Sequence, residues 1–250
     1  MTDLAGKVAL ITGASRGLGQ AVARELAGRG AAVMLAARNQ ADCQAQAREI
    51  EASGAKAMGI GCDVADYDQV AGMMEAAGKH FGGLDIVINN AAIIEPIAPL
   101  AESDPALWAR SISVNLIGPY NCMRAALPGF LDQGSGVVIN VTTSAARIPF
   151  THWSAYCAAK AGIAKLSATA QKEVAGTGVR IHEMLPGPMD TDMQVTIHAT
   201  GLNLAAGGLP GVKGPAKLAA WLCTDEAADL AGGQAAILDP EIRCRAEIGE

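Results

Sequence analysis

The chain has 250 residues, which is enough for one large domain or two small ones. Its 19 Lys and Arg against 25 Asp and Glu give a formal net charge of -6, so it has no overall positive field of the kind that attracts nucleic acid or an anionic membrane. Half of the residues are hydrophobic and 18% are charged, which excludes a disordered chain and supplies a large core.

Short apolar runs alternate along the chain with longer segments of helical periodicity. Continuous apolar runs, unlike alternating ones, indicate strands that are covered on both faces. The runs span residues 8–12, 32–36, 57–61, 86–89, 137–141, 179–184 and 235–238, and the helical segments lie near residues 17–29, 40–53, 66–80, 105–128, 154–175 and 214–224. Asp66, Asp104 and Ser154 are plausible helix caps. The alternation predicts one α/β domain over residues 1–250, with a doubly wound parallel sheet of about seven strands and helices on both faces.

The cysteines and histidines indicate neither a disulfide scaffold nor a metal centre. Six Cys are scattered without any C-x-x-C pair, and the four His form no H-E-x-x-H pattern, so we expect reduced thiols, a cytoplasmic protein and no metal. The N-terminal segment does not resemble a signal peptide. The uncharged stretch over residues 193–212 is broken by glycines and Pro210, so we interpret it as a mobile surface segment rather than a membrane span.

A glycine-rich turn joins the first predicted strand to the first helix. It reads Thr12-Gly13-Ala14-Ser15-Arg16-Gly17-Leu18-Gly19. Glycines at such a turn allow unusual backbone angles, and the helix that follows presents free N–H groups and the positive end of its dipole. A pyrophosphate fits this place, although a glycine turn with only a packing role is the alternative.

Further motifs follow in the order found in one enzyme family. They are Asp63-Val64 after the third strand, Asn89-Asn90-Ala91-Ala92 after the fourth, Val114-Asn115 in a helix, Tyr156-Cys157-Ala158-Ala159-Lys160, and Pro186-Gly187-Pro188-Met189-Asp190-Thr191. With T-G-x-x-x-G-x-G, this set resembles the short-chain dehydrogenase/reductase family over essentially the whole chain. The resemblance implies a single-domain Rossmann fold and hydride transfer to or from a nicotinamide cofactor.

The resemblance also implies the site residues. The catalytic set would be Asn115, Thr143, Tyr156 and Lys160. The cofactor would be held by Gly13, Ser15, Arg16, Gly17, Leu18, Gly19, Arg38, Asp63, Val64, Asn89, Ala91, Tyr156, Lys160, Pro186, Gly187, Met189 and Thr191. By the same resemblance, Asp63 would hold the adenine amino group, Lys160 the nicotinamide ribose, and Asn115 a water that links Lys160 to solvent.

Two positions depart from the family pattern. Ala92 replaces the last glycine of N-N-A-G. The catalytic serine expected thirteen residues before Tyr156 is Thr143, which keeps the hydroxyl and adds a methyl group. Ser144 would take its place if the strand end shifts by one residue.

Tyr156 and Lys160 are four residues apart on a predicted helix, so they share one face. A free phenol, with a pKa of about 10, is a poor acid–base group near neutrality, and a nearby ammonium favours the phenolate. Tyr156 can then give a proton to a carbonyl oxygen as hydride reaches the carbon, or take it back in oxidation. Thr143 would orient the substrate oxygen.

The second predicted strand bears on the choice of cofactor. NAD enzymes usually carry an acidic residue at its end, which accepts hydrogen bonds from the ribose hydroxyls. Ala37 stands there instead, and Arg38 and Arg16 are placed to bind a 2′-phosphate. The sequence therefore predicts NADP(H) in preference to NAD(H), unless both arginines are only solvated charges.

The segments expected to line the substrate site are mostly apolar. They are residues 93–99, 148–153 and 193–211, within a substrate-covering segment at about 188–213, and Arg147 is the one cation beside them. We expect a neutral, hydrophobic or aromatic ketone, and residues 186–194 are similar to sepiapterin and benzil reductases of the family. An NAD-dependent alcohol dehydrogenase or a 3-oxoacyl reductase is the alternative, although the family's D-G-G reads Asp239-Pro240-Glu241 here.

Rival functions lack support in the motifs. A non-catalytic NADP-binding sensor would need the glycine turn but not Tyr156, Lys160 and Asn115, and sugar-nucleotide epimerases are typically longer with another glycine spacing. Besides a small carbonyl or alcohol substrate, we expect no nucleic acid and no membrane partner. The resemblance implies a homotetramer or homodimer.

Overall fold

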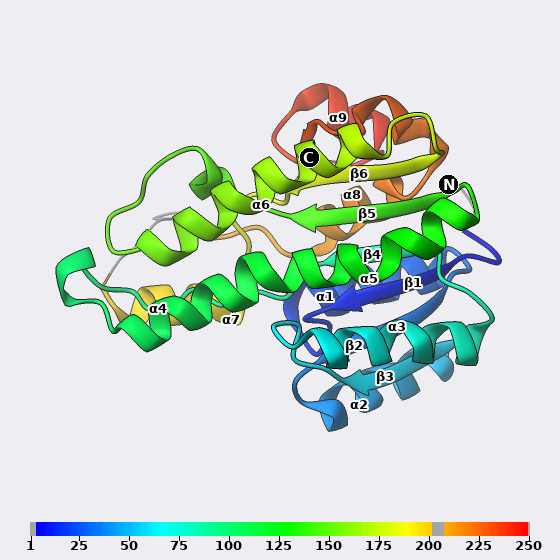
Figure 1. Ribbon diagram of the computed structural model, residues 1–250, viewed down its shortest axis with the longest axis horizontal. Coiled ribbons are helices and arrows are strands. Elements are labelled where there is room, and N and C mark those ends of the chain that lie inside the picture. Colours follow the sequence, from blue (N-terminus) through cyan, green and yellow to red (C-terminus); the bar gives the residue numbers. More distant parts are fainter. Residues whose placement is uncertain (1–3, 202–207, 250) are drawn as a thin grey trace.

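Seven parallel strands form the sheet at the centre of the computed structural model, which describes residues 4–201 and 208–249 (Figure 1). The strand order is β3-β2-β1-β4-β5-β6-β7, and every neighbouring pair is parallel. The strands are β1 (Val8–Thr12), β2 (Ala32–Ala37), β3 (Ala57–Gly61), β4 (Ile86–Asn89), β5 (Gly136–Val141), β6 (Val179–Leu185) and β7 (Gln234–Ala236). The chain reverses its direction of winding between β1 and β4, and ligands of such sheets bind beyond the carboxyl ends of the strands at this point.

Helices cover both faces of the sheet (Figure 1). In the view of Figure 1, α3, α5 and α6 lie in front of the strands, and α1, α2 and α8 lie behind them. The helices are α1 (Gly17–Gly28), α2 (Gln40–Glu51), α3 (Tyr67–Phe81), α4 (Pro105–Ile112), α5 (Gly118–Asp132), α6 (Ser154–Glu173), α7 (Asp192–Ala199), α8 (Lys213–Leu222) and α9 (Pro240–Arg245). This confirms the predicted doubly wound α/β fold.

The central strands bury both of their faces in the core. Ile11 of β1 and Leu26 of α1 pack in one cluster, whereas Leu10 of β1 and Phe130 of α5 pack in another on the opposite face. Successive side chains of a strand point to opposite faces, so both Leu10 and Ile11 must be apolar. This explains why the strands read as continuous apolar runs.

One predicted helix is broken in two. The helix expected over residues 105–128 is α4 and α5, joined by a π-helical turn at Ser113–Ile117. The N–H of Gly118 donates to the Ser113 carbonyl five residues back, and Pro119 has no N–H to continue the α-helical pattern. The turn holds Asn115 at its centre.

One other local expectation was wrong, and two were confirmed. The stretch interpreted as a mobile surface segment includes part of helix α7, and residues 202–207 of that stretch lie outside the described residues, so its mobility stays a prediction. Ser154 does not cap α6, because it is already the first residue of the helix and Trp153 stands at the N-cap position; its hydroxyl instead accepts a hydrogen bond from Trp108 Nε1 of α4 at 3.1 Å. Asp66 and Asp104 do cap α3 and α4 through their side chains.

Candidate active site

The carboxyl ends of β1 and β4 are tied together at the glycine turn. The Thr12 hydroxyl donates to the Ile88 carbonyl at 3.3 Å and accepts from the backbone N–H groups of Asn90 and Ala91, both at 3.1 Å. The Asn90 amide donates to the carbonyls of Thr12 and Gly13 at 2.9 and 3.1 Å. Thr12 and Asn90 stand in the quoted motifs, but the predicted site did not include them. Their hydrogen bonds fix the turn against the neighbouring strand.

The glycines of the turn serve two different needs. A Cβ at Gly13 would lie 2.8 Å from Ala91 Cα, and one at Gly19 would lie 2.4 Å from the Gly13 carbonyl oxygen. Gly17 instead has a φ of 58°, with Thr191 Cγ2 3.6 Å from the place of its missing Cβ. Packing therefore accounts for Gly19, and Gly13 combines close packing with a φ of 64°, whereas Gly17 lets the backbone turn into α1 opposite the start of α7.

The N-terminus of α1 fits a negatively charged phosphate group. Arg16, its N-cap residue, forms no side-chain capping bond, and the first turn has no acidic residue. By contrast, Asn39 and Asp66 cap α2 and α3 through their side chains. The first N–H groups of α1 are thus left for a ligand, at the place where the fold family binds the pyrophosphate of its cofactor. Leu18 is buried in the core, so only its backbone faces this place.

The adenine side of the predicted cofactor site contains a residue that the sequence analysis missed. The Asp63 carboxylate accepts from the Ala65 N–H at 3.1 Å and from Arg110 of α4 at 2.6 Å. Asn121 donates to the Val64 carbonyl at 2.9 Å, and a Cβ at Gly118 would lie 2.6 Å from Val64 Cγ2. These contacts hold the end of β3 against α4 and α5, with Arg110 as the neighbour of the predicted adenine ligand.

The two arginines predicted to bind a 2′-phosphate differ in their surroundings. Arg38 follows β2 and is exposed, and no ion pair forms at it among the described residues. Arg16 Nε lies 3.0 Å from Asp192 Oδ2 at the start of α7, with both side chains well exposed. This pairing joins residues 176 positions apart, so no local sequence pattern predicts it.

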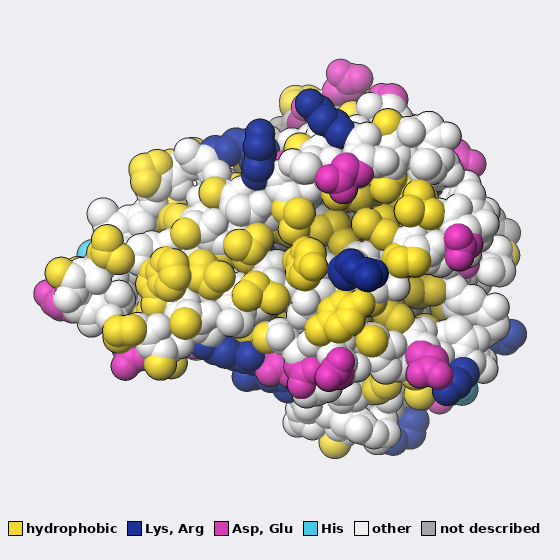
Figure 2. Space-filling model, viewed as in Figure 1, with side chains coloured by type: hydrophobic (Ala, Val, Ile, Leu, Met, Phe, Trp, Pro, Cys, Tyr) yellow, Lys and Arg dark blue, Asp and Glu magenta, His cyan; other side chains and the backbone are white. Residues whose placement is uncertain are grey.

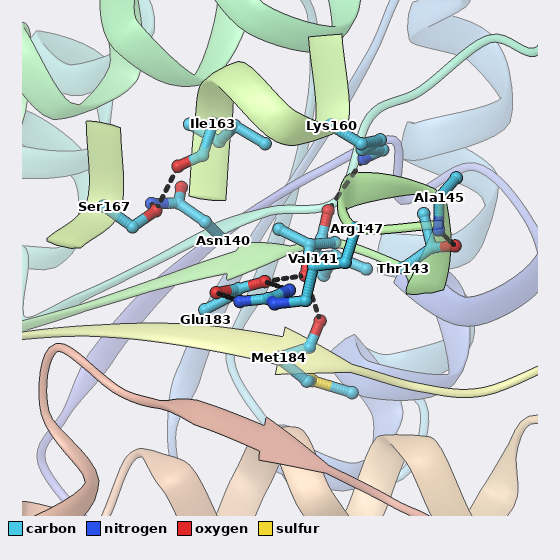
Figure 3. Close-up of polar contacts among 11 residues, drawn as sticks. Asn140, Val141, Thr143, Ala145, Arg147, Lys160, Ile163, Ser167, Glu183 and Met184 are labelled. Carbon is cyan, nitrogen blue, oxygen red and sulfur yellow. Dashed lines mark hydrogen bonds and ion pairs between the residues drawn. The ribbon is translucent and has the colours of Figure 1, made fainter. Parts of the chain in front are cut away.

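Other predicted cofactor residues use their side chains within the protein. The Asn89 amide donates to Asn140 Oδ1 at 2.8 Å, and Asn140 donates to the Ser167 hydroxyl at 2.8 Å, so these three side chains form a buried row (Figure 3 shows Asn140 and Ser167). Pro186, Gly187 and Met189 form the loop after β6, where Gly187 has a φ of 72°. Thr191 is the N-cap residue of α7 and faces Gly17. Ser15 is half-buried beside the same turn.

Three of the four predicted catalytic residues converge at the end of β5. Tyr156 and Lys160 are both buried on α6, and Lys160 Nζ donates to the Val141 carbonyl at 2.7 Å (Figure 3). Lys160 Nζ lies 5.6 Å from the centre of the Tyr156 ring. Thr143 is half-buried two residues after Val141, and its Oγ1 accepts from the Ala145 N–H at 3.1 Å, whereas Ser144 is exposed.

Asn115, the fourth predicted catalytic residue, has its side chain fully buried and its amide occupied. Its Oδ1 accepts from the Ile93 N–H at 3.0 Å, and its Nδ2 donates to the Ile93 carbonyl at 2.8 Å and to the Ser111 hydroxyl at 3.1 Å. The side chain thus fixes the chain after β4 to the π-helical turn. A water held by this residue stays a prediction.

Burial acts on both ionisable groups of α6. It raises the pKa of the Tyr156 phenol above its ordinary value and lowers the pKa of Lys160 to about 8. We expected Lys160 to lower the pKa of Tyr156. In the protein without ligands this pKa is raised instead, because desolvation disfavours the charged forms of both side chains. A lowered pKa of Tyr156 therefore stays a prediction for the protein with its ligands bound.

Apolar side chains surround the Tyr156 ring. Trp153 meets it edge-on with ring centres 6.0 Å apart, and Phe150 stacks on Trp153 at 5.1 Å. Ile94 and Ile197 belong to the same cluster, with Ile197 contributed by α7. The site thus combines the Tyr156 hydroxyl and the Lys160 ammonium with this cluster of apolar side chains, which we call the apolar wall.

The chain belongs to the short-chain dehydrogenase/reductase family. The family model described as short chain dehydrogenase matches residues 7–201. Members of this family are oxidoreductases that use a nicotinamide cofactor, NAD or NADP, and the free N–H groups of α1 fit the pyrophosphate of either.

Three known proteins illustrate the similarity. The cis-4-hydroxycyclohexanecarboxylate dehydrogenase of Sinomonas cyclohexanicum is 37% identical over 239 residues, which cover 93% of this chain and 95% of that protein. The 3beta-hydroxysteroid dehydrogenase 1 of Eggerthella lenta is 35% identical over 239 residues, covering 92% and 91%. The crystal structure of a short-chain type dehydrogenase/reductase from Mycobacterium marinum superposes with a TM-score of 0.87 at 31% identity, covering 97% of each chain.

Neither a membrane span nor a metal centre is found among the described residues. No helix in residues 4–201 and 208–249 is long and apolar enough to cross a bilayer. Over the same ranges, no group of three or more His, Cys, Asp or Glu side chains is arranged to hold a metal ion.

Proposed function

We propose that this protein is an NADP(H)-dependent reductase of neutral, hydrophobic or aromatic ketones, which it converts to secondary alcohols. The observation that carries this proposal is the apolar wall around Tyr156, with its hydroxyl group on α6 and Thr143 at the end of β5. The reaction is reversible, so the same site would oxidise the alcohol.

Each side chain has a separate role in the proposed reaction. Tyr156 transfers a proton to the carbonyl oxygen. Thr143, whose Oγ1 already accepts from the Ala145 N–H, donates a hydrogen bond to the same oxygen and orients it without losing its proton. Lys160 is held by the Val141 carbonyl beside the tyrosine ring, where its ammonium favours the phenolate and binds the nicotinamide ribose. Asn115 fixes the π-helical turn at Ser113–Ile117 to the backbone of Ile93 after β4. The cofactor, when bound, supplies or accepts the hydride.

The preference for NADP(H) rests on the end of β2. Ala37 offers no carboxylate to accept ribose hydroxyls or to repel a phosphate, and Arg38 is exposed without an ion pair among the described residues. Arg16 would have to exchange Asp192 for the 2′-phosphate. That exchange is cheap, because exposed ion pairs are worth at most about 1 kcal/mol.

The charge of the site favours a neutral substrate. Arg147, the cation that stands beside the predicted substrate segments, is bound by both of its terminal nitrogens to Glu183 at 2.8 Å each. Its charge is therefore already neutralised by Glu183, which weakens its attraction for a substrate carboxylate. By their names, the two relatives from Sinomonas and Eggerthella act on secondary alcohols carried on rings, which supports a cyclic ketone beside this wall. The ring alcohol named for the Sinomonas protein also bears a carboxylate, so the neutral charge of the substrate rests on the pairing of Arg147 and not on these names.

The same residues are compatible with two alternative enzyme activities. An NAD-dependent alcohol dehydrogenase would use the same four catalytic residues with the other cofactor. A 3-oxoacyl reductase is less favoured, because Asp239, at the start of the family's D-G-G, caps α9 and is followed by Pro240. A non-catalytic sensor would leave the Tyr156, Lys160 and Thr143 grouping unexplained.

We also propose that the protein is a homodimer or homotetramer. Figure 2 shows hydrophobic side chains gathered on the face covered by α4, α5 and α6. Large apolar residues on and beside α4 and α5 are exposed there: Leu107, Ile117, Tyr120 and Leu131. A second copy of the chain would cover this face, which light scattering with size-exclusion chromatography tests.

We also propose a cytoplasmic location, which is supported by the six cysteines, all of them free thiols.

The experiment is a panel of ketones assayed by the loss of NADPH absorbance, with NADH in parallel. The panel pairs cyclic and aromatic ketones with 2-oxo acids and 3-oxoacyl thioesters of similar size. We expect turnover of the neutral ring ketones and poor use of the charged acids. Faster turnover of the acids, or no hydride transfer with any substrate, would overturn the proposal.

A further inference from the structure

A buried carboxylate lies beside the strand end that carries Thr143. It belongs to Glu183 of β6, whose side chain is only 7% exposed. Its two oxygens accept hydrogen bonds from the two terminal nitrogens of Arg147 at 2.8 Å each, and Oε1 also accepts from the Thr142 hydroxyl at 2.8 Å (Figure 3). Sequence analysis assigned no role to Glu183 and placed Arg147 only near the substrate.

The energetics of this group point to a role other than stability. A carboxylate in the interior is costly unless its charge is paired and its lone pairs accept hydrogen bonds, and here Arg147 and Thr142 supply both. Even so, the pair adds little net stability, because the cost of desolvating the buried Glu183 carboxylate offsets its attraction to Arg147, whose side chain is 46% exposed. What such a pair does supply is geometry, because a bidentate guanidinium has one direction in which both bonds form.

The partners of Glu183 stand on both sides of Thr143. Thr142 precedes it, and Arg147 ends the short 3₁₀ helix Ser144–Ala146 that begins directly after it. The same 3₁₀ helix supplies the Ala145 N–H that binds Thr143 Oγ1. A single carboxylate on the neighbouring strand therefore holds the segment at both ends, while Lys160 holds the Val141 carbonyl just before it.

We propose that the Arg147–Glu183 ion pair is a positioning device for the Thr143 hydroxyl, an inference that rests on the proposed function. Glu183 fixes the end of β5 through Thr142 and draws the 3₁₀ helix toward β6 through Arg147. This sets the direction of Thr143 Oγ1 toward the oxygen that Tyr156 protonates. Arg147 and Glu183 act through Thr143 and do not touch the substrate.

A double-mutant cycle tests this, with Arg147→Gln made in the wild-type and in the Thr143→Val background. If Arg147 acts through the Thr143 hydroxyl, we expect Arg147→Gln to lower kcat about tenfold in the wild type and less than twofold once that hydroxyl is gone. Arg147→Lys keeps the charge but not the two parallel N–H donors of the guanidinium. Its kcat should lie between that of the wild type and that of Arg147→Gln. A general structural loss would lower kcat by the same factor in both backgrounds, which overturns the inference.

The control is a matched ion pair far from the site. Arg245 of α9 binds both oxygens of Asp229 at 2.7 and 2.8 Å, on the segment that precedes β7 and thus at the amino ends of the strands. Arg245→Gln should leave kcat unchanged in both backgrounds. NADPH fluorescence titration reports folding and cofactor binding of each variant, and the affinity should stay within about twofold.

Three further outcomes keep the test decisive. If Arg147→Gln does not fold because it leaves Glu183 buried and unpaired, the uncharged pair Arg147→Gln with Glu183→Gln replaces it in the cycle, with the same expectation. If Thr143→Val leaves kcat unchanged, the proposed role of Thr143 fails and this inference fails with it. If Thr143→Val is strongly impaired but the losses multiply independently, only the positioning role is overturned.

Discussion

His182 is expected to make the stability of this protein fall steeply between pH 6.5 and 4. Its imidazole is fully buried on β6, and neither ring nitrogen has a hydrogen-bond partner of ordinary geometry among the described residues. Burial first, and then the nearby Arg180 guanidinium, lower its pKa from 6.5 to about 4. The backbone of Leu230 and the Asp229 carboxylate act in the opposite direction without offsetting this shift.

The sign follows from which state binds the proton. Below pH 6.5 the unfolded chain protonates His182 while the folded protein keeps it neutral, so the free energy of unfolding falls as the pH drops. Below about pH 4 both states are protonated, and this contribution stops changing. The lowering of the His182 pKa from 6.5 to about 4 corresponds to about 3 kcal/mol of the free energy of unfolding. About 2 kcal/mol of this is lost between pH 7 and pH 5.

The measurement is urea unfolding of wild type and His182→Met at pH 7 and pH 5, at one protein concentration. Methionine fills a similar volume without a titrating group, so its stability should fall by about 2 kcal/mol less than that of the wild type over this interval. His80→Gln, which removes an exposed histidine at the end of α3, is the control for the loss of an imidazole. An equal loss of stability in wild type and His182→Met would refute the reasoning.

Three predictions concern the proposed chemistry. Tyr156→Phe should bind NADPH nearly as well as the wild type but turn over at least about 100-fold more slowly, because it lacks the proton donor; turnover within a few-fold of wild type contradicts that role. Thr143→Val should lower kcat by about 10² to 10³, and Thr143→Ser should retain much of it, whereas a severe loss in Ser144→Ala with a silent Thr143→Val would assign the role to Ser144. NADPH should exceed NADH by about tenfold or more in kcat/KM, and Ala37→Asp with Arg38→Ala should narrow or reverse this; equal use of both cofactors by the wild type at low salt would mean that the arginines are only surface charges.

The sequence by itself determined the sheet and the local part of the site. Strands that are covered on both faces are mostly apolar, even though β6 also carries the buried His182 and Glu183, so the seven strands were recognisable to within two residues at each end. Tyr156 and Lys160 lie four residues apart in one helix, so helical geometry alone places them on one face. The glycine turn was likewise readable, because unusual backbone angles and close packing both require glycine there.

Only the tertiary structure decided which polar side chains are already bound to other residues of the protein. The pairing of Glu183 with Arg147, of Asp63 with Arg110, and of Arg16 with Asp192 joins residues that lie 36, 47 and 176 positions apart. Nothing in the periodicity of either partner's segment encodes such contacts, because they arise where separate elements meet at the strand ends. The π-helical turn between α4 and α5 has both a local and a tertiary part: Pro119 lacks the N–H that would continue the α-helical pattern, and the Asn115 amide binds the backbone of Ile93 beyond β4. Local pattern thus set the elements and their order, and packing between distant elements set which charges and hydroxyls remain free for a ligand.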